Sequence, residues 1–283
     1  YAVTEMGMNH AGELTYLSNI ARPDVALVTN AAAAHLEGLQ SVEGVARAKA
    51  EIFSGVKSGG TAIINEDDQF AAMWRETAKN LKIIGFSLQH DADVTADFDL
   101  YKDHSRLGLH TPWGEVSCRL NVPGRHNIAN ALGAAALTES LGLSIGQIRA
   151  GLQTMSQDAN PGRSNLFDVD EFRVLVDFAH NPEAMKALFA MASAVPARRR
   201  VLCFGQAGDR TDEQIRELTR SAWGIGLDLV IVSELAHYRR GREPGAVFGI
   251  IRDELRKCGA EDSQIRHFEA EADSFDDALA WAE

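Results

Sequence analysis

The amino-acid sequence predicts an α/β protein of two domains, each built on a mostly parallel β-sheet with helices on its faces. The chain has 283 residues, more than one typical domain needs and enough for two hydrophobic cores. Short apolar runs alternate with longer helical patterns, as they do in βαβ units. Asn160, Pro161 and Gly162 interrupt the chain between two such series. We therefore expect one domain over residues 1–160 and a second over residues 161–283.

The first domain begins with strands and one long helix. Tyr1 stands inside what looks like a strand, so we expect the natural chain to begin upstream. Ser41 precedes a helical pattern and is a suitable N-cap residue. The predicted strands cover residues 1–4, 25–29, 61–65 and 82–86, and the predicted helix covers residues 41–56.

Residues 92–120 interrupt this alternation. Three β-rich segments at 93–100, 105–111 and 115–120 predict a small antiparallel insertion, with a turn at residues 112–114. Helical patterns follow at 127–141 and 144–155. The second domain then restarts the alternation as a Rossmann-like α/β unit. Its predicted strands cover residues 172–177, 200–204 and 227–232, and its predicted helices cover residues 183–194, 212–223 and 244–258.

The composition is that of an ordinary globular protein, with 45% hydrophobic and 24% charged residues. The formal net charge of -12 argues against a nucleic-acid partner, although arginine runs at 198–200 and 239–242 are suited to a smaller anion. Cys118, Cys203 and Cys258 lack metal-ligand or redox spacing, which fits a reducing, cytoplasmic setting. No apolar stretch has the length of a membrane span, and no signal-peptide pattern is present.

Several polar residues stand where open α/β sheets place ligands, after the carboxyl ends of strands. Glu5 follows the first predicted strand, and His35 follows a loop of small residues after the second. Lys49 lies in the helix that comes next. Asn127 and Asn130 share one face of a later helix and can present amides to a base edge. Each has an ordinary alternative as a surface acid, a structural histidine, a solvated lysine or a helix cap.

Three segments together resemble the Mur ligases, in particular the branch that adds D-alanyl-D-alanine to UDP-N-acetylmuramoyl-tripeptide. They are Glu-Met-Gly-Met-Asn-His at 5–10, Asn-Ala-Ala-Ala-Ala-His-Leu-Glu-Gly at 30–38 and Pro-Gly-Arg-His-Asn-Ile-Ala-Asn-Ala at 123–131. The resemblance implies an ATP-binding central domain over residues 1–160. It implies that Glu5 and His35 bind Mg²⁺, that a carbamylated Lys49 positions a second Mg²⁺, and that Asn127 and Asn130 face the adenine.

The second domain is similar to the carboxy-terminal, Mur-type domain of cyanophycin synthetases. The segments 160–167, 176–182, 208–213 and 240–243 carry this similarity. It implies that Arg163 reaches the nucleotide phosphates and that Asp177 reaches the ribose or the nearby phosphate region. His180 and Asn181 would face the cleft from the loop after a strand. The loop at 208–210 has a less defined role, with a surface turn as its alternative.

One departure from the family pattern is the phosphate-binding loop, because no Gly-rich loop ending in Gly-Lys-Thr or Gly-Lys-Ser occurs. In the family this loop precedes the segment of Glu5. We therefore expect a truncation at both ends and no ligase activity of these residues alone.

The resemblance implies an ATP-dependent ligase that joins a carboxylate to an amine through an acyl phosphate. The substrates would be small molecules or peptides, with a peptidoglycan precursor expected first. Lys49, Arg163 and His180 would be its catalytic residues, and they would stabilise charge. A cyanophycin-type ligase and a non-catalytic nucleotide-binding scaffold are the alternatives.

Overall fold

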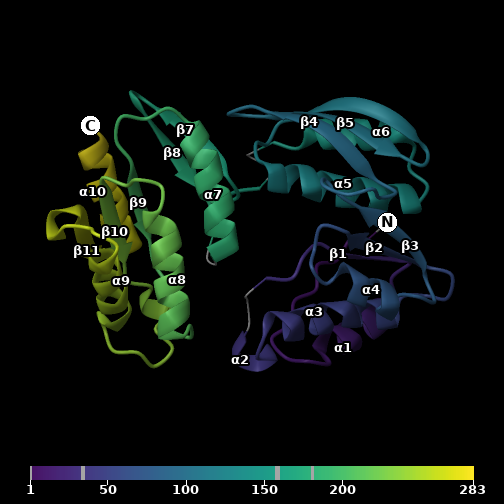
Figure 1. The fold of residues 1–283 in the computed structure, drawn as a ribbon, viewed down its shortest axis with the longest axis horizontal. Helices are drawn as coiled ribbons and strands as arrows, with labels where there is room; N and C mark the ends of the chain where they lie inside the picture. The colour runs from purple at the N-terminus through teal and green to yellow at the C-terminus, as the bar shows by residue number, and fades with distance from the viewer. Residues whose placement is uncertain (1, 33–35, 157–159, 180–181) are drawn as a thin grey trace. The chain divides into compact units, whose positions relative to one another are not determined.

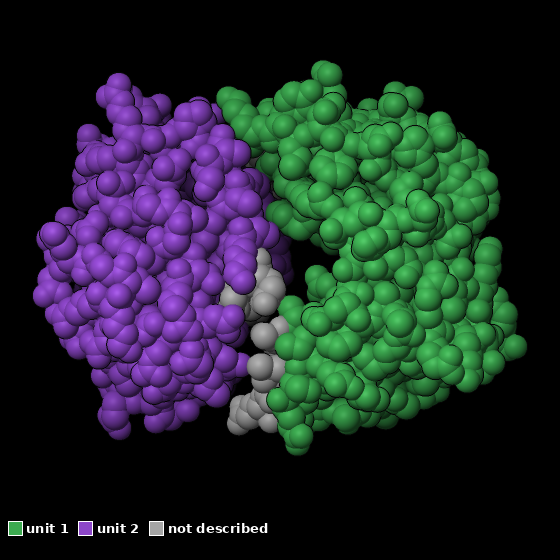
Figure 2. Space-filling model, in the orientation of Figure 1, with its two compact units in different colours: residues 1–159 green, residues 160–283 purple. Residues whose placement is uncertain are grey.

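The computed structural model describes every residue except 1, 33–35, 157–159 and 180–181. The described residues form two compact units, residues 1–159 and residues 160–283, which are coloured separately in Figure 2. Among the described residues, each unit contains a parallel sheet of three strands and one antiparallel sheet (Figure 1). This architecture confirms the predicted α/β fold class. None of the helices in the described part of the chain is long and apolar enough to cross a membrane.

The parallel sheet of unit 1 lies where the sequence predicts it. Its strands are β1 (Val25–Val28), β2 (Thr61–Asn65) and β3 (Lys82–Phe86), in the order β1-β2-β3. Alternate side chains of β2 enter two different cores, Ile63 against α5 (Arg125–Ser140) and Ile64 beside Trp74. Both residues are fully buried. A strand covered on both faces reads as a continuous apolar run, and this explains the successful prediction.

The prediction of a strand over residues 1–4 is wrong for residues 2–4, because residues 2–8 have no regular structure. Val3 is 82% exposed. No other described segment pairs with residues 2–4, so a strand there would leave its backbone groups without ladder partners. The chain then enters α1 (Glu13–Ala21).

The helix predicted over residues 41–56 changes type near its middle. It consists of α3 (Val42–Ala50) and a 3₁₀ turn (Glu51–Gly55). Ser41 caps it as expected, because its Oγ accepts a hydrogen bond of 3.0 Å from the Gly44 N–H. The short helices α2 (Leu36–Leu39) and α4 (Ala71–Thr77) complete this part of unit 1.

The antiparallel insertion is also confirmed. Strands β4 (Thr95–Leu100), β5 (Ser105–Thr111) and β6 (Gly114–Leu120) pair in that order. Leu107 and Leu109 of β5 are buried in the same core as Ile128 and Leu132 of α5. The helix α6 (Ile145–Thr154) begins at a capping box of Ser144 and Gln147.

Unit 2 departs from the prediction at its first strands. The segment predicted as a strand over 172–177 is β8 (Phe172–Val176), but it pairs antiparallel with β7 (Asn165–Val169), which the sequence pattern did not indicate. Both strands are only partly buried, so they are not covered on both faces as a strand inside a parallel sheet is.

The parallel sheet of unit 2 has the order β11-β10-β9. Helices cover both of its faces: Ile215 and Ile251 pack with Val230 on one face, and Ala278 packs with Ile231 on the other. The strands are β9 (Val201–Phe204), β10 (Leu229–Ser233) and β11 (Ile265–Phe268), and the helices are α7 (Pro182–Ala194), α8 (Asp212–Trp223), α9 (Ala246–Lys257) and α10 (Glu271–Ala282).

Candidate functional site

Lys49 is a half-buried residue in the last turn of α3. Its Nζ donates a hydrogen bond of 2.8 Å to the backbone oxygen of Asn30, in the loop after β1. Burial lowers the pKa of Lys49, and the negative charge of Asp68 opposes this shift. The amine therefore lies against a strand-end loop of the parallel sheet and is not a freely solvated group.

The loop after β1 is held by side chains from three elements. Asn65, at the end of β2, donates from Nδ2 to the Thr29 oxygen at 2.8 Å. Lys49 binds the next oxygen, that of Asn30. The carboxylate of Asp68 accepts from the Ala31 N–H at 2.8 Å and, through its other oxygen, from the Phe70 N–H at 2.9 Å. The loop that leads toward His35 is thus fixed at three successive residues.

Asp68 was not among the residues predicted from the sequence. The available signal was its position, since it stands in a pair of aspartates shortly after β2. A carboxylate there is on the ligand-binding edge of an open sheet.

Glu5 lies in the segment without regular structure and is exposed. It makes no hydrogen bond or ion pair with any other residue that the structure describes. The neighbouring Met8 is buried with Val45 and Ala48 of α3, so the segment of Glu5 packs on the helix that carries Lys49. His35 lies outside the described residues.

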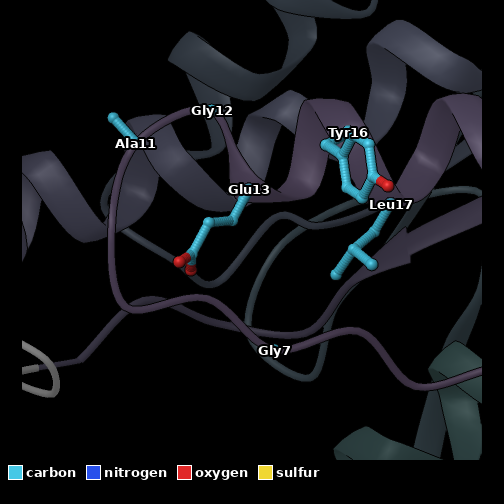
Figure 3. A pocket seen from close by; sticks show the side chains of 6 residues that line it. All are labelled: Gly7, Ala11, Gly12, Glu13, Tyr16 and Leu17. Carbon is cyan, nitrogen blue, oxygen red and sulfur yellow. The ribbon is translucent and has the colours of Figure 1, made fainter.

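A surface pocket of about 440 Å³ separates this segment from α1 (Figure 3). Glu13, one of its lining residues, accepts hydrogen bonds from the backbone N–H groups of Asn9 (2.6 Å) and His10 (3.2 Å). These bonds hold the pKa of Glu13 below its usual range. The lining residues are Gly7, Ala11, Gly12, Glu13, Tyr16 and Leu17.

The two asparagines lie in the first turns of α5, three positions apart. Asn127 is half-buried, and its Nδ2 donates to the Pro123 oxygen at 2.7 Å. Asn130 is exposed. One of the two N–H donors of the Asn127 amide is thus engaged, whereas the amide of Asn130 is exposed to solvent.

In unit 2 the structure brings the segments of Arg163 and Asp177 together. The pairing of Asn165 with Val176 places the two segments side by side. Asp177 accepts hydrogen bonds from the N–H (2.8 Å) and Oγ (3.0 Å) of the buried Ser164. The guanidinium of Arg163 lies 5.2 Å from the ring centroid of Phe178. His180 and Asn181 lie outside the described residues.

The loops after β9 and β10 bind each other through Arg242. Its guanidinium donates to the oxygens of Gly208 (2.8 Å) and Arg210 (2.6 Å) and to the carboxylate of Asp212 (2.7 Å). A Cβ on Gly208 would lie 1.9 Å from the Arg239 oxygen, so only glycine fits there. Arg242 therefore serves the internal structure of unit 2 and is not a free cation for an external anion.

The described residues contain no cluster of three or more His, Cys, Asp or Glu side chains arranged to hold a metal ion. In that part of the chain, the segment of Glu5 packs on the helix that carries Lys49. In unit 2, Arg163 and Asp177 flank the open end of the β7–β8 hairpin.

Comparison with known families identifies both units. Residues 1–138 match the Mur ligase middle domain, and residues 162–283 match the Mur ligase glutamate ligase domain. The chain belongs to the Mur ligase family.

Relatives of both kinds that the sequence motifs indicate are among the matches. The UDP-N-acetylmuramoyl-tripeptide–D-alanyl-D-alanine ligase of Escherichia coli K12 is 39% identical over 238 residues, which cover 82% of this chain and 52% of the relative. A cyanophycin synthetase of Geminocystis herdmanii is 32% identical over 248 residues, covering 81% of this chain and 28% of the relative. The crystal structure of MurF from Acinetobacter baumannii superposes with a TM-score of 0.82 at 28% identity, covering 99% of this chain and 58% of that one. The chain thus spans about half the length of the tripeptide ligase and 28% of the length of the cyanophycin synthetase.

Proposed function

We propose that the protein to which these residues belong is an ATP-dependent ligase that joins the carboxylate of a UDP-N-acetylmuramoyl peptide to an amine. The observation that carries this proposal is the match of both units to Mur ligase domains, together with a relative at 39% identity that is named for this reaction. Each unit has a hydrophobic core of its own. Unit 1 matches the middle domain, and unit 2 matches the glutamate ligase domain.

The residues present fit Mg²⁺ and ATP in their chemistry. Glu5 offers an exposed carboxylate, which is a preferred ligand of Mg²⁺, and His35 would be a second ligand. Asn130 offers an open amide for the adenine edge, and the Oδ1 of Asn127 can accept a hydrogen bond. When bound, ATP supplies the phosphoryl group and Mg²⁺ offsets the charge of its phosphates.

The substrate carboxylate would attack the γ-phosphate of ATP, which would release ADP and give an acyl phosphate. The amine would then attack the acyl carbon and form the amide, with release of phosphate and a proton. Negative charge on phosphate oxygens is the quantity to stabilise in both steps. Arg163 would contribute a guanidinium suited to phosphate, and its turn is braced by Asp177 through Ser164. Lys49, once carbamylated, would become an anion that orients a second Mg²⁺. His180 would act from the loop after β8. None of these residues needs to carry a proton.

The alternative substrate is a growing amino-acid polymer, favoured by the cyanophycin synthetase relative that aligns over 81% of this chain. The alternative of another class is a nucleotide-binding scaffold without ligation. We place the protein in the cytoplasm, where its three free thiols would stay reduced.

The test is release of phosphate from ATP by the full-length protein, with the amine as the variable. We expect release to require both UDP-N-acetylmuramoyl-tripeptide and D-alanyl-D-alanine. A cyanophycin primer with aspartate and arginine is the second arm, and activity only there would select the polymer ligase. Nucleotide binding without phosphate release in either arm would refute the proposal of a ligase and favour the nucleotide-binding scaffold. A Glu43→Gln variant, changed at an exposed ion pair with Arg47, serves as the activity control.

A further inference from the structure

Glu51 joins two parts of unit 1 that are far apart in the sequence. It is the first residue of the 3₁₀ turn, two residues after Lys49. Its two carboxylate oxygens lie 2.8 Å and 2.9 Å from the backbone nitrogen of Gly12, which donates to them. One oxygen also accepts from the N–H (3.2 Å) and the Oγ (3.4 Å) of Thr15.

These contacts satisfy the start of α1. The first N–H groups of a helix have no partner inside the helix and carry partial positive charge, so a carboxylate is a favourable acceptor there. Gly12 is the N-cap residue and has φ 91°, a left-handed conformation that favours glycine. Glu51 thus binds the point at which the irregular segment turns into the helix.

The same contacts restrain the segment of Glu5. Residues 2–8 have no regular structure to set their position. Between Glu5 and Gly12, the described restraints include the packing of Met6 and Met8 in one hydrophobic cluster. They also include the bonds from Asn9 and His10 to Glu13, which belongs to α1 itself. Glu51, in the turn directly after Lys49, links this turn by hydrogen bonds to the start of α1, where the segment of Glu5 ends.

We propose that Glu51 is a positioning residue of the ligation reaction, which holds the segment of Glu5 in place beside the helix of Lys49. This inference rests on the proposed function, in which Glu5 contributes to Mg²⁺ binding and Lys49 orients a second ion. Glu51 acts through the backbone of Gly12 and Thr15 and touches neither substrate nor cation.

The test compares Mg²⁺ requirements of full-length variants. In Glu51→Gln the side chain keeps its size, but only one oxygen remains and an amino group faces the backbone donors. We expect the Mg²⁺ concentration for half-maximal ligation to rise roughly tenfold. This is the lower end of the range of effects seen when a residue that orients a metal ligand is replaced. Glu51→Asp keeps the charge with a shorter reach, and its effect should be smaller. Glu43→Gln removes an exposed glutamate of α3 that pairs with Arg47, and it should leave the requirement unchanged.

The outcomes separate this inference from the proposed function. Glu5→Gln should itself raise the Mg²⁺ requirement, and if it does not, the cation role of Glu5 fails. Suppose that Glu5→Gln raises the Mg²⁺ requirement, whereas Glu51→Gln lowers the midpoint of thermal unfolding but leaves the Mg²⁺ requirement and the turnover unchanged. Glu51 is then merely a helix cap, and the inference is overturned. Should Glu51→Gln not fold, Glu51→Asp decides in the same way. Faster hydrogen exchange at Gly12 and Thr15 in either variant reports loss of the contacts independently of activity.

Discussion

Removing the carboxylate of Asp68 should loosen the loop after β1 and destabilise unit 1. In Asp68→Ala, the Ala31 and Phe70 N–H groups lose acceptors at 2.8 Å and 2.9 Å. Hydrogen bonds to charged groups contribute about 1.5–3 kcal/mol each. Because the site is half-buried, water replaces part of what is lost, and we expect the free energy of unfolding to fall by about 2–3 kcal/mol. Asp68→Asn keeps one acceptor oxygen and should lose about half as much.

The same substitution should change Lys49. The negative charge of Asp68 raises the pKa of Lys49 against the larger, lowering effect of burial. In Asp68→Asn the pKa of Lys49 should therefore fall further, and more of the side chain is the neutral amine at neutral pH. A lysine-acylating reagent should then label Lys49 faster than in the wild type.

Hydrogen exchange read at Ala31 and Phe70, together with urea unfolding, measures the first effect, and peptide mapping of the acylated lysine measures the second. Asp91→Ala, at an exposed position of the same unit, is the control and should stay within about 0.5 kcal/mol of the wild type. Unchanged exchange at Ala31 in Asp68→Ala, with stability as in the control, would refute the role of Asp68 as the brace of this loop.

Three further predictions follow from single residues. Lys49→Ala in the full-length protein should fold but lose ligation, with partial recovery in acetate, and wild-type rates would exclude the carbamylation role. Cys203 is half-buried, and burial raises its pKa to about 11. Iodoacetamide at pH 8 should therefore label it much more slowly in the native than in the denatured protein, and rapid native labelling would contradict the raised pKa. His110 has Glu115 at 3.2 Å and Asp97 at 3.1 Å, which raise its pKa. Its contribution to stability should be fully present below the unfolded-state pKa, near 6.5, and should disappear as pH rises through the higher folded-state value. A stability difference between wild type and His110→Gln that grows above pH 6.5 would contradict this sign, and an NMR titration gives the folded pKa.

The local sequence was sufficient for most elements of the two sheets. Strands β2 and β3 have the predicted bounds because both faces of a parallel strand are buried, which makes the strand a continuous apolar run. The cap at Ser41 was predictable because a helix cap is a local feature, in which the cap and its N–H donor are three residues apart. Strand β7 was missed because a half-exposed antiparallel pair has no such run, and its pairing with β8 depends on the partner.

The sequence by itself determined the fold class, the family resemblance and the identity of Glu5, Lys49 and Arg163 as candidates. Only the tertiary structure decided what surrounds them. Asp68 reaches Ala31 across 37 positions, and Glu51 reaches Gly12 across 39. No local pattern encodes such a bond, because it exists only once the packing of α3 and β2 has brought distant backbone donors within hydrogen-bond distance of each carboxylate.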